Sequence, residues 1–142
     1  MAKIYLASSW RNERQPHIVS WLRTAGHMVY DFRNPPDGQG GFAWSQIDPD
    51  WRDWTAKAFR FELYTNPIAR HGFYQDLSGM KWADTCVLLL PCGRSAHLEA
   101  GWMAGAGKRV VIYTEDGEEP DLMYLLADKI VIDMSELLEA LK

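Results

Sequence analysis

Short apolar runs alternate with longer amphipathic stretches along the chain. Five runs are rich in β-forming residues and bounded by polar or turn residues, as buried strands are, and they cover 3–8, 27–32, 85–91, 109–114 and 129–133. Apolar residues that recur every three or four positions predict helices around Ile18–Ala25, Leu77–Trp82, Leu98–Met103, Leu122–Leu126 and Leu137–Leu141. Strands that alternate with helices predict an α/β fold, a three-layer sandwich in which helices cover both faces of a five-stranded parallel sheet.

Two of the predicted strands end in segments rich in small and polar residues. The unbroken apolar run at 87–90 is typical of a central strand. In an open parallel sheet, ligands bind beyond the carboxyl ends of the strands, where the strand order reverses. With the order 2-1-3-4-5, the segments after the first and third strands are neighbours at that point. The candidate binding residues on them are Ser8, Ser9, Trp10, Arg11, Gly93, Arg94, Ser95 and His97.

Residues 33–54 fit neither a strand nor a helix pattern. They hold three prolines and three tryptophans, and a loop of this length in a compact domain is usually either functional or disordered. The aromatic residues argue against disorder. Two interpretations stay open from sequence: a lid over a ligand pocket, and a loop that its tryptophans attach to the core.

Carboxylates near the expected switch point are the candidates for chemistry. If Ser95 is the N-cap of its helix, a capping box needs an acid at position 98, but the acid comes one residue later, as Glu99. Glu99 is then either a catalytic carboxylate or a partner of the helix dipole. Asp76 is expected to begin a helix, either as a second acid of the site or as a plain N-cap. Asp84 precedes the third strand, at the opposite edge of the sheet, and is expected to be structural.

Composition narrows the classes of partner. The 142 residues suit one domain, and a net charge of −4 with a pI near 5.5 argues against wrapping duplex nucleic acid. No apolar run approaches the ~18 residues of a membrane span and no stretch resembles a signal peptide, so we expect a cytoplasmic protein without membrane contact. Cys86 and Cys92 end one extended run and are expected to stay reduced. The histidines lack metal-ligand spacing, so neither metal nor cofactor is expected.

Five stretches, in the same order along most of the chain, resemble the nucleoside 2-deoxyribosyltransferase superfamily. They are IYLASSW (4–10), DLSGM (76–80), ADTCVLLLP (83–91), SAHLEAGWMAGAGKRVVIY (95–113) and EPDLMYLLAD (119–128). The resemblance is greatest to a bacterial and phage branch with a GRSAHLEAG signature. It implies one flavodoxin-like domain over residues 1–142, although the family's small transferases lack the Trp-rich segment at 42–54, so that the lid interpretation of 33–54 rests on composition alone. It also implies cleavage of the N-glycosidic bond of 2′-deoxynucleosides or their 5′-monophosphates, with the sugar passed to another base or to water.

The resemblance also implies roles for single residues. Glu99 would be the nucleophile that attacks the anomeric carbon, and Asp76 would protonate or orient the departing base. Tyr5 and Trp10 would contact the nucleophile and the base. An oxocarbenium-like centre is served well by such a pair of carboxylates.

A second group of residues would complete a neighbouring site. Asp121 and Met123 match the family positions that reach the 5′ end of the sugar across a subunit interface, which implies a homodimer or a larger assembly. Six residues before the nucleophile, the transferases carry an acid and the monophosphate hydrolases a serine, but this chain has Gly93. Arg94 and Ser95 stand beside it and could hold a 5′-phosphate instead.

Three classes of function follow from these patterns. The favoured one is transfer of deoxyribose between bases through a covalent glycosyl-glutamate, and hydrolysis of a nucleoside 5′-monophosphate is the alternative within the same chemistry. A nucleotide-binding or sensor module without turnover is an alternative of another class. A flavodoxin-like redox protein is disfavoured, because neither strand-end loop is the Ser/Thr-rich cradle that a flavin mononucleotide requires.

Overall fold

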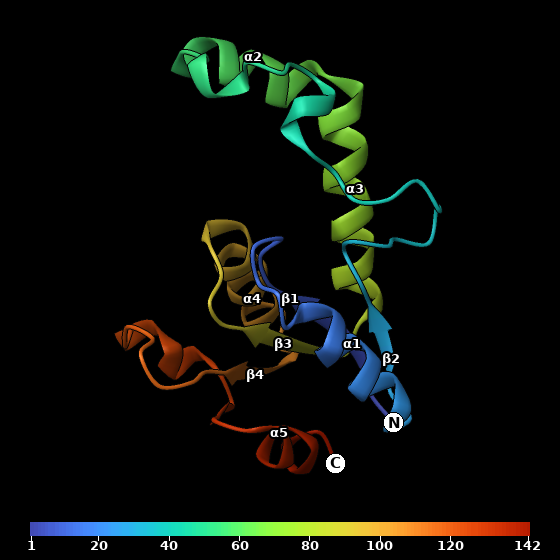
Figure 1. Ribbon diagram of the computed structural model, residues 1–142, viewed down its shortest axis with the longest axis vertical. Coiled ribbons are helices and arrows are strands. Elements are labelled where there is room, and N and C mark those ends of the chain that lie inside the picture. The colour runs from blue at the N-terminus through green and yellow to red at the C-terminus, as the bar shows by residue number, and fades with distance from the viewer. The chain divides into compact units, whose positions relative to one another are not determined.

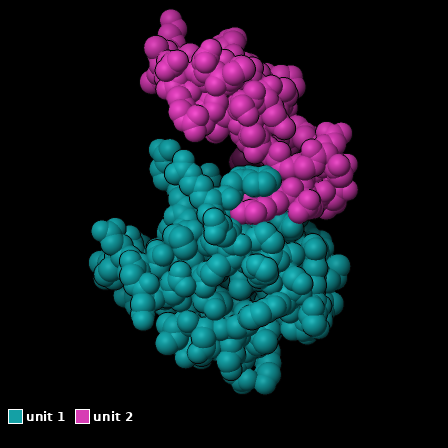
Figure 2. Space-filling view, in the orientation of Figure 1, with its two compact units in different colours: residues 1–31, 80–142 teal, residues 32–79 magenta.

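The computed structural model describes residues 1–142, which form two compact units. One unit consists of residues 1–31 and 80–142, and the other of residues 32–79 (Figure 2). The chain therefore leaves the first unit once and returns to it once. None of its helices combines the length and the apolar character needed to span a bilayer.

The first unit is built on a five-stranded parallel sheet (Figure 1). Its strands are β1 (Lys3–Ala7), β2 (Met28–Tyr30), β3 (Thr85–Leu89), β4 (Arg109–Tyr113) and β5 (Lys129–Val131). The order β2-β1-β3-β4-β5 and the four parallel pairings confirm the predicted fold class. β3 is buried along its whole length, as its unbroken apolar run predicts.

Helices cover both faces of this sheet. They are α1 (Gln15–Thr24), α4 (Arg94–Gly105), α5 (Met134–Ala140) and the 3-10 helix η3 (Leu122–Leu126). The largest core cluster joins alternate residues of the strands to α1 and α5, and it includes Ile4, Leu6, Val87, Leu89, Val111, Ile18, Leu22 and Leu137. α4 packs on the sheet through its buried residues Ala96, Ala100 and Met103. The predicted helix at 122–126 is present, in the tighter 3-10 form.

The 32–79 unit contains more helix than its sequence pattern predicts. Two 3-10 helices, η1 (Trp44–Gln46) and η2 (Trp51–Asp53), precede α2 (Ala56–Thr65) and α3 (Pro67–Trp82), whose last turn belongs to the first unit. α2 begins where the Thr55 hydroxyl accepts the Ala58 N–H at 3.1 Å. The tryptophans pack locally, since Trp44 meets the rings of Trp54 and Phe59 edge to face, at 5.8 and 6.1 Å between centroids. They therefore tie the 33–54 segment to α2.

The expectation that Asp76 begins a helix is wrong. α3 starts nine residues earlier, at Pro67, and Asp76 is the tenth residue of that helix. Proline is favoured in a first turn because its missing N–H has no partner to lose there. Asp76 is thus an interior helical residue, and the N-cap interpretation of it is excluded.

Candidate functional site

Glu99 and Tyr5 meet at the sheet. Tyr5 lies in β1 with 1% of its surface exposed, and its hydroxyl donates a short hydrogen bond to Oε2 of Glu99, which is partly buried on α4. The Tyr5 ring stacks on that of Tyr30, with 5.1 Å between centroids and 8° between planes. The stacked ring fixes the phenol, and the phenol in turn fixes one oxygen of the carboxylate.

The start of α4 removes the plain explanations for Glu99. The helix begins at Arg94 with Gly93 as its N-cap, so the assignment of Ser95 as the cap is wrong. Glu99 is the sixth residue of the helix, beyond the first turn in which a carboxylate complements the helix dipole best. Its side chain accepts a hydrogen bond from the Tyr5 hydroxyl of β1.

A cavity of about 690 Å³ lies where the loops after β1 and β3 meet, and neither Tyr5 nor Glu99 is among the residues that line it. It is lined by Ser8, Ser9, Trp10, Arg11, Pro91, Cys92, Gly93, Arg94, Ser95 and Ala96. The two strand-end segments predicted to be neighbours are thus brought together. Ser95, which lines the cavity, and Glu99 are four residues apart on α4, so the two side chains share a face of that helix.

Two residues whose structural roles were not predicted from sequence, Asn12 and Arg14, fix the shape of this cavity. Asn12, 3% exposed, donates to the Pro91 carbonyl at 3.2 Å and accepts the Arg14 N–H at 3.0 Å. The Arg14 guanidinium donates to the Leu90 carbonyl at 2.9 Å and pairs with Glu115 at 3.2 Å. Both side chains connect the loop after β1 to the loop after β3. Arg14 is therefore a structural tie, whereas Arg11 and Arg94 line the cavity.

The serines of the first loop also have defined contacts. The Ser8 hydroxyl donates to the Leu89 carbonyl at 2.9 Å, which joins the ends of β1 and β3. The Ser9 hydroxyl accepts the Arg11 N–H at 3.1 Å and shapes the turn that carries Trp10, which is 52% exposed. The loop thus presents an aromatic side chain on a backbone held at both ends.

His97 bridges α4 to the segment after β4. Its Nδ1 lies 2.7 Å from the Gly93 carbonyl and its Nε2 lies 3.0 Å from the Tyr124 hydroxyl, while the two rings stack at 5.8 Å. A carbonyl only accepts, so Nδ1 carries a proton, and in the neutral imidazole Nε2 then accepts from Tyr124. Tyr124 had no sequence signal of its own, apart from its place in the EPDLMY stretch.

The residues expected to serve a neighbouring subunit lie on the same segment. Asp121 is the N-cap of η3, because its side chain accepts the Met123 N–H at 2.8 Å. Met123 is 60% exposed. Both line a smaller cavity of about 210 Å³ that α4 and β4 also border.

Two further side chains have structural roles. Asp84 accepts the Lys3 N–H with both carboxylate oxygens at 3.2 Å and the Thr85 hydroxyl at 2.8 Å, which confirms its predicted structural role. Burial, followed by the charges of Glu118 and Glu99, raises the pKa of Cys92 to about 12. The Cys92 thiol therefore stays protonated at neutral pH and does not compete with Glu99 as a nucleophile.

Tyr5→Phe should lower turnover roughly ten- to a hundredfold, because the variant loses one hydrogen bond to a charged group. The Phe ring keeps the stack on Tyr30, so the melting temperature should change little. Steady-state kinetics and thermal melts of the variant check both expectations. Tyr113→Phe is the matched control, since Tyr113 is also a buried tyrosine of the sheet. An equal loss in both variants contradicts a specific role for Tyr5.

The fold described here is shared with three solved structures. A 2-deoxyribosyltransferase from Bacillus psychrosaccharolyticus matches 95% of this chain with 89% of its own, at a TM-score of 0.65 and 23% identity. A CMP N-glycosidase from Clostridium botulinum, BcmB, matches 97% of this chain with 96% of its own chain, at a TM-score of 0.53 and 16% sequence identity. A conserved protein from Enterococcus faecalis V583 matches 98% of this chain with 96% of its own chain, at a TM-score of 0.59 and 16% sequence identity. No family model and no curated protein sequence matches the chain.

Proposed function

We propose that this protein is an enzyme that breaks the N-glycosidic bond of a nucleoside or a nucleoside 5′-monophosphate, with Glu99 as its nucleophile. The observation that carries the proposal is the Glu99 carboxylate held by the buried Tyr5 hydroxyl, one helical turn beyond a cavity at the strand ends. The activities named for two proteins of the same fold support it. The buried phenol orients the carboxylate through one of its oxygens.

The reaction has two steps. An oxygen of Glu99 bonds to the anomeric carbon as the C–N bond breaks, and the electron pair of that bond leaves with the base. Asp76, the acid that the sequence resemblance assigns to this role, gives its proton to a nitrogen of the departing base. In the second step a base or a water loses a proton to Asp76 and attacks the same carbon, which releases Glu99. Two displacements retain the configuration of the sugar.

We favour a second base over water as the sugar acceptor, as in a deoxyribosyltransferase. Hydrolysis of a 5′-monophosphate shares every group up to the glycosyl-enzyme, so it is the second candidate. A binding module without turnover is the third, and it gives no reason for a carboxylate held by a buried phenol, because Glu99 would repel an anionic ligand.

We also propose that two copies of the chain complete each site. The outer faces of α4 and η3 expose Leu98, Trp102, Leu122, Met123, Leu125 and Leu126. Side chains of this size seldom stay in water as a group, and a contiguous apolar surface is typical of an interface. Gly101 and Gly105 have open space around the position of a Cβ, so a partner helix can approach α4 closely there. Asp121 and Met123 of one copy would then reach the sugar bound to the other.

Arg94→Ala should lower kcat/KM for a 5′-monophosphate by roughly ten- to a hundredfold more than kcat/KM for the matching nucleoside. Arg94 lines the cavity beside the N-terminus of α4, where backbone N–H groups also favour an anion. Parallel kinetics with a deoxynucleoside and its 5′-monophosphate measure the difference. Arg60→Ala removes an exposed arginine of α2 as a control. Equal losses for both substrates mean that Arg94 does not contact the phosphate.

Chromatography of reaction mixtures tests the proposed function. The protein is incubated with 2′-deoxynucleosides and their 5′-monophosphates, with and without a second free base. Release of base supports N-glycosidic chemistry, and a new nucleoside that forms only with added base supports transfer. If no substrate releases its base, the enzyme proposal fails and the binding module takes its place.

A further inference from the structure

The side chain of Lys108 binds the end of helix α3. Its ammonium group donates hydrogen bonds to the carbonyls of Met80 and Lys81, at 2.7 Å each, and a shorter one to the carbonyl of Ala83. The last four carbonyls of a helix have no partner within the helix, and a lysine ammonium has three donors to offer them. All three donors of Lys108 are therefore used at one helix end.

The turn after α4 determines where the Lys108 side chain starts. Gly107 takes the left-handed conformation, with a φ of +79°, and the Lys108 N–H donates to the Met103 carbonyl at 3.0 Å. The next residue, Arg109, begins β4 and pairs with Thr85 of β3. A helix that connects two parallel strands ends at the edge of the sheet where the second strand begins. Lys108 therefore joins the ends of α3 and α4 at the edge opposite the candidate site.

The end of α3 is shielded from water. Met80 is 6% exposed and Ala83 is 2% exposed, and Lys108 itself is half-buried. A buried carbonyl that loses its hydrogen-bond partner destabilises the structure around it. An apolar side chain at position 108 should therefore loosen the last turn of α3 in particular.

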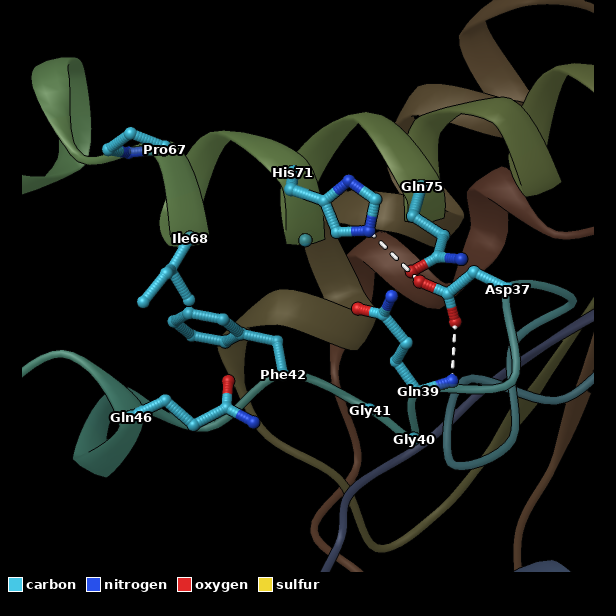
Figure 3. A pocket seen from close by; sticks show the side chains of 11 residues that line it. Asp37, Gln39, Gly40, Gly41, Phe42, Gln46, Pro67, Ile68, His71 and Gln75 are labelled. Atoms are coloured by element: carbon cyan, nitrogen blue, oxygen red, sulfur yellow. Dashed lines mark hydrogen bonds and ion pairs between the residues drawn. The ribbon is translucent and has the colours of Figure 1, made fainter.

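The first half of α3 is held by a separate contact within the 32–79 unit. The Phe42 side chain lies against Gly72, where an added Cβ would come within 3.0 Å of the Phe42 Cβ (Figure 3). This contact joins α3 to the loop that precedes it, whereas Lys108 binds the last turn, which belongs to the sheet unit. Asp76 lies between these two points of attachment on one continuous helix.

We infer that Lys108 is a positioning residue for Asp76. The inference rests on the proposed function, in which Asp76 gives a proton to the departing base. Asp76 precedes Met80 by four residues, so the two share a face of α3 about 6 Å apart along its axis. Lys108 holds that last turn, and the helix carries the constraint to the carboxyl group one turn away. A misplacement of about 1 Å can cost a reaction about a hundredfold in rate, so the constraint matters for catalysis.

Kinetics of Lys108→Met test this inference, because methionine keeps a long side chain and lacks the ammonium group. With purine deoxynucleosides, kcat should fall roughly ten- to a hundredfold, and KM should change little because no residue that lines the cavity is altered. In the Asp76→Asn background the same change should cost at most about two- to threefold more, because the group that Lys108 positions is already lost. Lys129→Met is the control: it removes an exposed lysine at the start of β5 and should leave kcat unchanged.

Hydrogen exchange provides a measurement that does not depend on activity. The amides of the last turn of α3 should exchange roughly tenfold faster in Lys108→Met than in the wild type, while those of β3 exchange as before. Unchanged exchange in that turn overturns the inference, because Lys108 then does not hold the helix end.

The kinetic outcomes separate this inference from the proposed function. An unaltered kcat in Lys108→Met, or a loss in the double variant as large as the loss in the single variant, overturns the inference while the wild type still releases base. Lys108→Gln, whose amide can still donate to a carbonyl, takes the place of the methionine variant if that variant does not fold. If neither variant folds, Lys108 has a structural role only and the inference fails. If the wild type releases no base, the proposed function itself fails, and the role of Lys108 in catalysis fails with it.

Discussion

Glu99→Gln should lose turnover by roughly 10⁴-fold or more, because a neutral amide cannot form the glycosyl ester. The amide oxygen still accepts the Tyr5 hydroxyl, so the melting temperature should stay close to that of the wild type. Kinetics and thermal melts measure the two effects. Mass spectrometry of the wild type mixed rapidly with substrate should also detect the protein plus one sugar, and this species should be absent from the variant.

A second glutamate serves as the control for that experiment. Glu118→Gln changes a carboxylate on the loop after β4 and should leave turnover within a few-fold of the wild type. Activity in Glu99→Gln within tenfold of the wild type would mean that Glu99 is not the nucleophile. A large fall in melting temperature would mean that its contact with Tyr5 serves stability first.

Asp76→Asn should lower turnover by roughly 10²- to 10⁴-fold, the usual contribution of a positioned general acid. The effect should depend on the leaving group. A 7-methylpurine deoxynucleoside already carries a positive charge on its base and leaves without a proton from the enzyme. Asp76→Asn should therefore cleave this substrate almost as fast as the wild type, while it cleaves ordinary purine deoxynucleosides slowly.

Comparison of the two substrates distinguishes acid catalysis from a structural role. Equal losses on both would mean that Asp76 supports the unit that carries it rather than the leaving base. Ser78→Ala, two residues further along α3, is the control for changes to that helix, and it should leave both rates unaltered.

The sheet was predictable because its signals are local. Each strand is a short apolar run bounded by polar residues. The unbroken apolar run of β3 was enough to predict a central position in the sheet. α2 was not predicted, because none of its residues is buried and its apolar side chains follow no core-facing stripe. Its cap, Thr55, and the proline that opens α3, Pro67, were the signals available. The prediction did not use these two signals, so it placed the start of α3 at Asp76 instead of Pro67.

The parts of the candidate site that lie within one continuous stretch of sequence were predictable. The position of Glu99 one residue past the capping-box position was visible in the sequence, and so were the two loops that line the cavity. The structural roles of Asn12, Arg14 and Tyr124 were not predicted, because they depend on carbonyls and side chains that the fold brings close from distant parts of the chain. Single polar residues carry no spacing from which such contacts could be predicted.

The division of the chain into two units has a consequence for how such an enzyme diversifies. Tyr5 and Glu99 belong to the sheet unit, whereas the proposed general acid, Asp76, lies within residues 32–79. The latter segment leaves and rejoins the sheet unit as one uninterrupted insertion. A graft that exchanges this insertion for that of a relative would replace the group proposed to act on the departing base and leave the proposed nucleophile and its tyrosine unchanged. The two halves of the proposed chemistry are therefore open to separate inheritance.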